Sequence, residues 1–154
     1  MSVGAVPYGY AGGLADSAPP SGRYCCVVST ASTAPVVLVV EDNAAMRTLI
    51  RSLVEPVSSA VHECADAETA LELYARIHPD WVLMDVQMSG MDGIAATRAI
   101  RQADPRARVI VVTEHGQEQY RRAAEAAGAS GFVLKENLRE LPRLLAPSKE
   151  AQDV

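Results

Sequence analysis

Polar side chains follow several apolar runs of this chain, at the positions where each run ends. The acids Glu41 and Asp42 follow the run VVLVV, and Asp85 follows WVLM. Thr113 follows VIVV, and Lys135 follows FVL. If these runs are buried parallel strands, all five groups lie at the carboxyl edge of one sheet, which is where open α/β folds bind ligands. Three carboxylates, a hydroxyl and an ammonium at one edge are suited to divalent-metal and phosphoryl chemistry on an aspartate.

The acidic group is best explained by a bound cation. Three carboxylates within a few ångströms repel one another unless a cation or a proton lies between them, and Mg²⁺ prefers such oxygen ligands. Alone, Glu41 and Asp42 would be interpreted as acids that stabilise the start of a helix. With Asp85 at the end of another apolar run, a metal site becomes the better hypothesis. Asp85 is also the candidate nucleophile, because a carboxylate can form an acyl phosphate once cations such as Lys135 neutralise the incoming charge.

Strands and helices alternate from Pro35 onward. Short β-branched runs predict strands that are covered on both faces, and longer stretches with apolar residues every three or four positions predict helices. The predicted strands are 36–40, 59–64, 81–84, 108–112 and 130–134. The predicted helices are 43–55, 67–77, one from about 93 to 101, and 117–127, followed by a last helix from about 137. This order predicts an α/β fold with a doubly wound, five-stranded parallel sheet of flavodoxin-like type, strand order 2-1-3-4-5, with helices on both faces.

Residues at the helix ends support these boundaries. Asp66 is a suitable N-cap for the helix that follows it, and Gly128 suits the left-handed position after a helix. In the last helix, Asn137 is the predicted cap. Pro142 should kink or shorten that helix, because it removes a backbone donor. Its core-facing residues are predicted to be Leu138, Leu141, Leu144 and Leu145.

The composition indicates a single cytoplasmic domain. The chain has 154 residues and a formal net charge of −5, which argues against a nucleic-acid surface. Residues 1–34, rich in Gly, Ala, Ser and Pro, are expected to be a disordered extension, 35–146 the folded domain, and 147–154 a flexible tail. Three cysteines fit no disulfide framework, so a reducing cytoplasm is expected. No apolar stretch is long enough to span a membrane, and the amino terminus does not have the pattern of a signal peptide.

The motifs taken together resemble a known family. The segments VVLVVEDN, WVLMDVQMSGMDG, VIVVTEHG and GASGFVLKENL are similar, in order and spacing, to the motifs of the response-regulator receiver domain of two-component signalling. Lys135 is followed by an acid, Glu136, and many receivers attached to helix-turn-helix output domains share this pattern, whereas others have a proline with a cis peptide. A trans bond is expected here, because a non-proline cis bond costs about 2.5–4 kcal/mol.

The resemblance implies a role for each residue of the site. Asp85 would be the phosphoacceptor. Glu41, Asp42, Asp85 and the backbone carbonyl of Gln87 would hold Mg²⁺ or Mn²⁺. Thr113 and Lys135 would contact the phosphoryl oxygens. Phe132 would be the aromatic residue whose rotamer follows Thr113 during activation. Modulation of the reaction would involve Gln87, Glu114 and His115, and Glu114 departs from the small residue that is common at its position.

The function implied is that of a stand-alone response regulator. A sensor histidine kinase or a histidine phosphotransfer protein would donate the phosphoryl group to Asp85, and the signal would pass on by contact with an unknown downstream protein. The chain would not be an enzyme, since it would assist only its own phosphorylation and dephosphorylation, and neither DNA nor a membrane would be a direct partner. A homodimer through the face from Gln117 to Ala127 and from Ser130 to Leu134 is left open.

Other functions on a similar fold are also considered. A pseudo-receiver would be an interaction module that phosphorylation does not control, and Glu114 and Pro142 keep this alternative open. An aspartate-nucleophile phosphatase would carry a second Asp two residues after the nucleophile, where this chain has Gln87. A nucleotide-binding Rossmann domain would carry a glycine-rich segment after the first strand, and none follows here.

Overall fold

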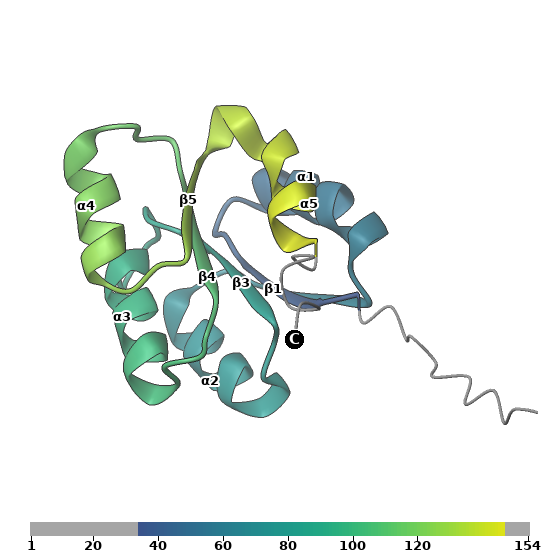
Figure 1. The fold of residues 1–154 in the computed structure, drawn as a ribbon, viewed down its shortest axis with the longest axis horizontal. Coiled ribbons are helices and arrows are strands. Elements are labelled where there is room, and N and C mark those ends of the chain that lie inside the picture. Colours follow the sequence, from purple (N-terminus) through teal and green to yellow (C-terminus); the bar gives the residue numbers. More distant parts are fainter. Residues whose placement is uncertain (1–33, 147–154) are drawn as a thin grey trace, which may run out of the picture. The chain divides into compact units, whose positions relative to one another are not determined.

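Five parallel strands form the centre of the molecule. The structure is a computed structural model that describes residues 34–146, so the expected amino-terminal extension before residue 34 and the expected carboxyl-terminal tail lie outside the described residues. All neighbouring strands pair in parallel, in the order β2-β1-β3-β4-β5. Figure 1 labels four of them, β1, β3, β4 and β5. The strands are β1 (Val36–Val40), β2 (Ala60–Cys64), β3 (Trp81–Asp85), β4 (Val109–Thr113) and β5 (Gly131–Leu134). The predicted flavodoxin-like fold class is confirmed.

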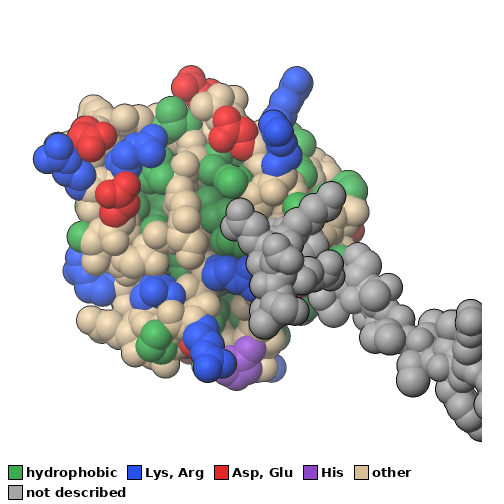
Figure 2. Space-filling model, in the orientation of Figure 1, with side chains coloured by type: hydrophobic (Ala, Val, Ile, Leu, Met, Phe, Trp, Pro, Cys, Tyr) green, Lys and Arg blue, Asp and Glu red, His purple; other side chains and the backbone are tan. Residues whose placement is uncertain are grey.

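Helices cover both faces of this sheet. The α-helices are α1 (Ala44–Val54), α2 (Ala67–Ile77), α3 (Gly93–Ala103), α4 (Glu118–Ala126) and α5 (Leu141–Leu145). Two 3₁₀ helices, η1 (Glu55–Val57) and η2 (Lys135–Glu140), precede β2 and α5. Figure 1 shows α1 and α5 on one side of the sheet and α2, α3 and α4 on the other. On the face shown in Figure 2, acidic and basic side chains are intermixed.

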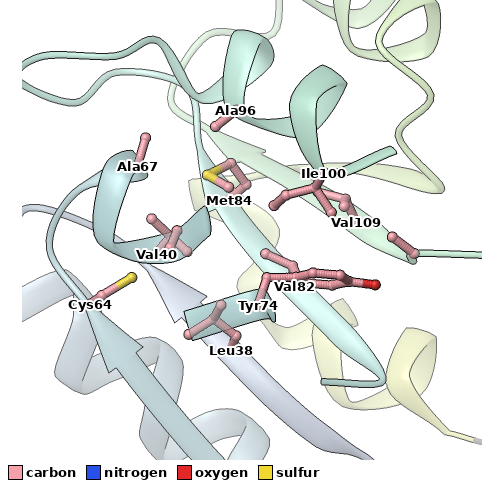
Figure 3. Close-up of a cluster of buried hydrophobic side chains, with 12 residues drawn as sticks. Leu38, Val40, Cys64, Ala67, Tyr74, Val82, Met84, Ala96, Ile100 and Val109 are labelled. Carbon is pink, nitrogen blue, oxygen red and sulfur yellow. The ribbon is translucent and has the colours of Figure 1, made fainter. Parts of the chain in front are cut away.

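The core follows the two-residue period of the strands. In β1, Leu38 and Val40 face α2 and α3, whereas Val37 and Val39 face α1 and α5. Both sets are at most 1% exposed, which explains why the sequence of this strand is apolar at every position. Figure 3 shows the first cluster, in which Tyr74 of α2 and Ile100 of α3 pack over Val82 and Met84 of β3.

Side-chain caps start three of the helices, and the predicted cap of α2, Asp66, is one of them. The Asn43 carbonyl oxygen accepts from the N–H groups of Ala45 and Met46, and Asp66 accepts from the N–H of Thr69. Asp92 caps α3 in the same way. After α4, Gly128 has a φ of 91°, which is the left-handed conformation expected of it.

The last helix differs from its prediction in two residues. The helix is shortened, as expected: α5 begins at Leu141, and Pro142 lies in its first turn. Leu138, Leu141 and Leu145 are buried. Asn137, however, does not cap α5: it lies within η2, and Glu140 holds the cap position without a side-chain hydrogen bond. Leu144 is 43% exposed instead of facing the core, because the 3₁₀ turn changes the helical phase.

A buried tyrosine joins α2 to α3. The Tyr74 hydroxyl donates to Asp104 Oδ2 at 2.8 Å, and burial together with this carboxylate raises the pKa of the phenol from 10.0 to about 12. The folded state therefore binds this proton more tightly than the unfolded state does. This contribution to stability is complete below pH 10 and is lost as the pH rises toward 12.

We therefore expect Tyr74→Phe to change the alkaline behaviour of the protein. In a spectrophotometric titration, the variant should lack a tyrosine that ionises near pH 12 in the wild type. Wild-type stability, measured by denaturant unfolding, should fall relative to the variant between pH 10 and 12. A wild-type titration with no tyrosine ionising so late would contradict the assignment.

Candidate phosphoryl-acceptor site

A polar cavity opens at the carboxyl edge of the sheet, between the ends of β1 and β3. From β1 the chain continues to β2 on one side, and β3 pairs with β1 on the other, so the strand order reverses here. Such a reversal is the usual binding crevice of open α/β sheets. The cavity has a volume of about 140 Å³. It is lined by Glu41, Asp42, Asn43, Asp85, Gln87, Glu114 and Lys135.

The three predicted acids meet in this cavity. Glu41 and Asp85 are buried, with 1% and 2% of their surfaces exposed, whereas Asp42 is exposed. One carboxylate oxygen from each of the three lies within 4.8 Å of the others, which is close enough to surround a single ion. Because all of the donors are oxygens, the cluster could hold a hard cation such as Mg²⁺.

Lys135 is the cation closest to these acids in the described structure. Its Nζ lies 2.9 Å from Glu41 Oε2 and 3.4 Å from Asp85 Oδ1. Burial lowers the pKa of the ammonium, but the contacts with Glu41 and Asp85 outweigh burial and leave that pKa raised. Burial and, next, the charge of Glu41 raise the pKa of Asp85 to about 6, although Lys135 opposes them. A single ammonium therefore does not balance the buried carboxylates, and a divalent ion would.

The other predicted residues lie at different distances from the cavity. Gln87 is exposed at its mouth, and its backbone N–H approaches Asp85 Oδ1 at 3.4 Å. Glu114 is exposed and lines the cavity. Thr113 is fully buried, and its hydroxyl oxygen accepts from the N–H of His115 at 3.1 Å. Thr113 is absent from the cavity lining, so the structure places its hydroxyl near the site without bringing it into the cavity.

Two predicted residues lie outside the cavity. His115 stacks on Tyr120, with 5.2 Å between the ring centroids. Phe132 is partly buried on β5, and the guanidinium of Arg121 lies 5.0 Å from the centre of its ring. These contacts involve α4, β5 and the loop between β4 and α4. Across the sheet, Phe132 pairs with Val111, and Thr113 pairs with Leu134, which lies two residues further along β5.

The structure adds residues that the sequence analysis did not assign to the site. Asn43 lines the cavity, and its backbone N–H approaches Glu41 Oε1 at 3.2 Å. Arg47 of α1 donates to the backbone carbonyl of Glu41. The position of Asn43 directly after the acidic pair was a usable signal. Nothing in the spacing of Arg47 indicated that its side chain would fold back to the strand end.

Comparison with known proteins now identifies the family. The sequence profile of the response regulator receiver domain matches residues 37–146, which is most of the chain. The chain is a member of the response-regulator receiver domain family. Receiver domains of two-component systems relay signals by phosphorylation and interact with histidine kinases and downstream proteins. The predicted family is confirmed.

Individual relatives agree with this assignment. The chain is 38% identical over 99 residues to the chemotaxis protein CheY of Halobacterium salinarum, a match that covers 64% of this chain and 82% of that protein. A LuxR-family two-component response regulator from Aurantimonas sp. SI85-9A1 superposes with a TM-score of 0.68 at 39% identity, covering 73% of this chain and 85% of that one. The receiver domain of the histidine kinase CKI1 from Arabidopsis thaliana, in complex with Mg²⁺ and BeF₃⁻, superposes with a TM-score of 0.64 at 28% identity, covering 74% and 89%.

Two further features concern one peptide bond of the site and the lengths of the helices. The bond from Lys135 to Glu136 is trans, as predicted, and there is no cis peptide among the described residues. Within residues 34–146, no helix has the length and apolar character needed to cross a membrane.

Proposed function

We propose that this receiver accepts a phosphoryl group on Asp85 in a Mg²⁺-dependent reaction and relays the signal by protein contact. The observation that carries the proposal is the setting of the Asp85 carboxylate. It is buried at the end of β3, it faces Glu41 and Lys135, and it borders an open cavity. The donor would be a sensor histidine kinase or a histidine phosphotransfer protein, and the output would be contact with a downstream protein in the cytoplasm.

The residues present fit a bound divalent ion. Glu41, Asp42 and Asp85 would hold Mg²⁺ or Mn²⁺, and the backbone carbonyl of Gln87 at the cavity mouth would complete the set. The ion would neutralise charge on the phosphoryl oxygens. Its binding would also relieve the repulsion from Glu41 that, together with the larger effect of burial, raises the pKa of Asp85. The CKI1 receiver, a structural neighbour of this chain, has been solved in complex with Mg²⁺ and BeF₃⁻, which supports the proposed metal site.

The chain's own side chains would then carry the transfer. An oxygen of Asp85 attacks phosphorus and forms the acyl phosphate bond, while the bond from phosphorus to the donor nitrogen or oxygen breaks and its electron pair stays on the donor. Lys135 moves from its pairing with the carboxylates to meet the added negative charge. The Thr113 hydroxyl would exchange its bond from the His115 N–H for a bond to a phosphoryl oxygen. Water later removes the phosphoryl group, so the chain turns over no other substrate and is not an enzyme in the ordinary sense.

The change at Thr113 would reach the surface through β5 and α4. Phe132 packs against α4, and the guanidinium of Arg121 lies over its ring in a cation–π contact. A rotation of Phe132 would break this contact and alter the surface from Gln117 to Ala127 and from Ser130 to Leu134. That surface is where a downstream partner or a second copy of the chain would bind. Phosphorylation would shift the equilibrium between the two arrangements of this surface only to the extent that it stabilises one arrangement more than the other.

A pseudo-receiver, acting independently of phosphorylation, is the second candidate. The observations in its favour are the acid Glu114 at the cavity and the Thr113 hydroxyl that bonds to the backbone instead of facing the cavity. Retention of Asp85, Lys135 and the acidic pair in one cavity favours the phosphorylated alternative.

The two candidates differ in a direct experiment. The intact mass of the full chain is measured after incubation with acetyl phosphate, with and without Mg²⁺, and again with a purified histidine kinase as donor. The proposal predicts a gain of one phosphoryl group that requires Mg²⁺ and is absent in Asp85→Asn. No gain from either donor, in a chain that is folded by circular dichroism, would favour the pseudo-receiver.

The charge of Glu114 leads to a quantitative prediction. Glu114→Ala should speed phosphorylation by acetyl phosphate, because the dianionic donor no longer meets a fourth carboxylate at the cavity. The gain should be about fivefold at most, since an exposed charge pair contributes about 1 kcal/mol or less. Glu118→Ala is the matched control, because this exposed acid pairs with Arg122 and does not line the cavity. A slower rate in Glu114→Ala would show that the acid assists the reaction.

A further inference from the structure

One arginine contacts the backbone that joins the two acids of the site. Arg47 lies in α1, and its NH1 donates to the carbonyl oxygen of Glu41 at 2.7 Å. That carbonyl belongs to the peptide group between Glu41 and Asp42. The plane of this peptide group is fixed relative to both flanking Cα atoms, so its orientation is one of the factors that set where the two side chains point. A hydrogen bond to its oxygen therefore acts on both carboxylates at once.

A carboxylate on the edge strand holds the same guanidinium from the other side. Arg47 Nε lies 3.8 Å from Glu63 Oε1, and Glu63 belongs to β2. The side chains of Arg47 and Glu63 are 23% and 26% exposed, so water screens this pair only in part. The guanidinium is thus fixed at two points, and its planar fork can satisfy both, unlike the compact ammonium of a lysine.

The Glu41 side chain also contacts the Asn43 N–H and the Lys135 ammonium, but the rest of the loop that carries the acids has few restraints. Its Glu41 N–H continues the sheet by donating to the Cys64 carbonyl at 3.1 Å, and its end is the N-cap of α1. Between these points, the Glu41 carbonyl is held by Arg47. Asp42 is exposed, and no hydrogen bond to its side chain is found in the described structure. The orientation of the peptide group is therefore the main restraint on where the Asp42 carboxylate points.

We propose that Arg47 is a positioning residue that holds the peptide between Glu41 and Asp42 in the orientation needed to bind the divalent ion. The inference rests on the proposed function, since it assigns the metal to these acids. Arg47 touches neither the ion nor the phosphoryl group. It acts through the backbone, with Glu63 as its anchor.

The sign of the effect separates positioning from simple electrostatics. If Arg47 acted only through its positive charge, removing that charge would tighten cation binding, and replacing it with lysine would leave binding unchanged. If Arg47 positions the acids, both Arg47→Gln and Arg47→Lys should weaken binding, because neither can span the Glu41 carbonyl and Glu63 together. Loss of an outer partner of a metal ligand weakens binding by on the order of tenfold.

The chain offers a matched control in Arg51. Its NH1 lies 2.5 Å from the other oxygen of Glu63, so Arg51→Gln also removes a charge and an ion pair with Glu63. Arg51 does not contact the acidic loop in the described structure. Its other ion pair is to Glu55 at 3.7 Å. Glu63→Gln is a further variant, which keeps Arg47 but removes its anchor.

The test is the dissociation constant of Mg²⁺ for the full chain, measured by isothermal titration calorimetry without any phosphodonor, with thermal unfolding as a check on folding. We expect Arg47→Gln and Arg47→Lys to bind Mg²⁺ roughly tenfold more weakly, Glu63→Gln to show a smaller loss, and Arg51→Gln to stay within about twofold of wild type. If Arg47→Gln does not fold, Arg47→Lys and Glu63→Gln give the same comparison.

The outcomes distinguish the positioning role of Arg47 from the proposed metal site on which it rests. Wild-type protein that does not bind Mg²⁺ would overturn the proposed metal site itself. Wild-type binding with unchanged affinity in both Arg47 variants would overturn the positioning role alone. Tighter binding in Arg47→Gln, with Arg47→Lys unchanged, would replace positioning by a charge effect.

Discussion

Gly93→Ala is expected to lower the free energy of unfolding by about 3 kcal/mol, the upper part of the range for overpacked sites. Gly93 is the first residue of α3 and packs against the end of β3, the strand that carries Asp85. A Cβ atom at this position would lie 1.8 Å from the backbone oxygen of Asp85 and 3.1 Å from the Cα of Val86. Backbone atoms cannot move aside as a flexible side chain can. The start of α3 or the end of β3 must therefore shift, and the Asp85 carboxylate with it.

The measurement is chemical denaturation of wild type and variant, together with the rate of phosphorylation. Gly90→Ala, in the loop that precedes α3, is the control. Gly90 has a φ of 99°, but a Cβ there would meet nothing within 4 Å, so only the cost of the left-handed backbone is expected, about 1 kcal/mol. A Gly93→Ala variant no less stable than Gly90→Ala would show that the close packing of α3 on Asp85 is wrong.

Asp85→Asn is expected to make the metal-free protein more stable, by about 1–2 kcal/mol, while abolishing phosphoryl transfer. Asp85 is 2% exposed and shares one ammonium with the equally buried Glu41. Burial and the charge of Glu41 raise the pKa of Asp85 to about 6, which means that its ionised form costs stability at neutral pH. An amide of the same shape removes that cost. The proposed role of Asp85 as the nucleophile would explain why the site has a destabilising charge.

A second acid provides a control of opposite sign. The Asp66 carboxylate accepts from both the backbone N–H and the hydroxyl of Thr69, and these hydrogen bonds hold the pKa of Asp66 below its usual range. Asp66→Asn should therefore cause a small loss of stability. Thermal unfolding of Asp85→Asn and Asp66→Asn, measured without Mg²⁺, tests these two predictions. A loss of stability in Asp85→Asn would mean that the Lys135 ion pair outweighs burial and repulsion.

Much of the fold could be predicted because its signals are local and repeated. The strand Val36–Val40 has apolar residues on both faces, and acidic or amide caps start the first three helices. The meeting of Asp85 with Glu41 follows from topology alone, since parallel strands end at the same edge. These features need no knowledge of side-chain conformation.

The errors arose where conformation depends on tertiary packing. Leu144 has the spacing of a core residue, yet the 3₁₀ segment η2 takes up the residues before α5 and turns Leu144 outward. The same segment leaves Asn137 without its predicted capping role. Arg47 was not assigned to the site because the direction of a long side chain is set by its partners. These partners, the Glu41 carbonyl and Glu63, come together only in the folded chain.

The central claim is that Asp85 carries the phosphoryl group, and chemical mapping tests it most directly. Full-length protein treated with acetyl phosphate and Mg²⁺ is reduced with borohydride, which converts an aspartyl phosphate to homoserine, and is then digested and sequenced by tandem mass spectrometry. The account predicts homoserine at position 85 and at no other acidic residue, with none formed when Mg²⁺ is omitted. Conversion at Glu41 or Asp42 instead of Asp85, or modification that does not require Mg²⁺, would contradict it.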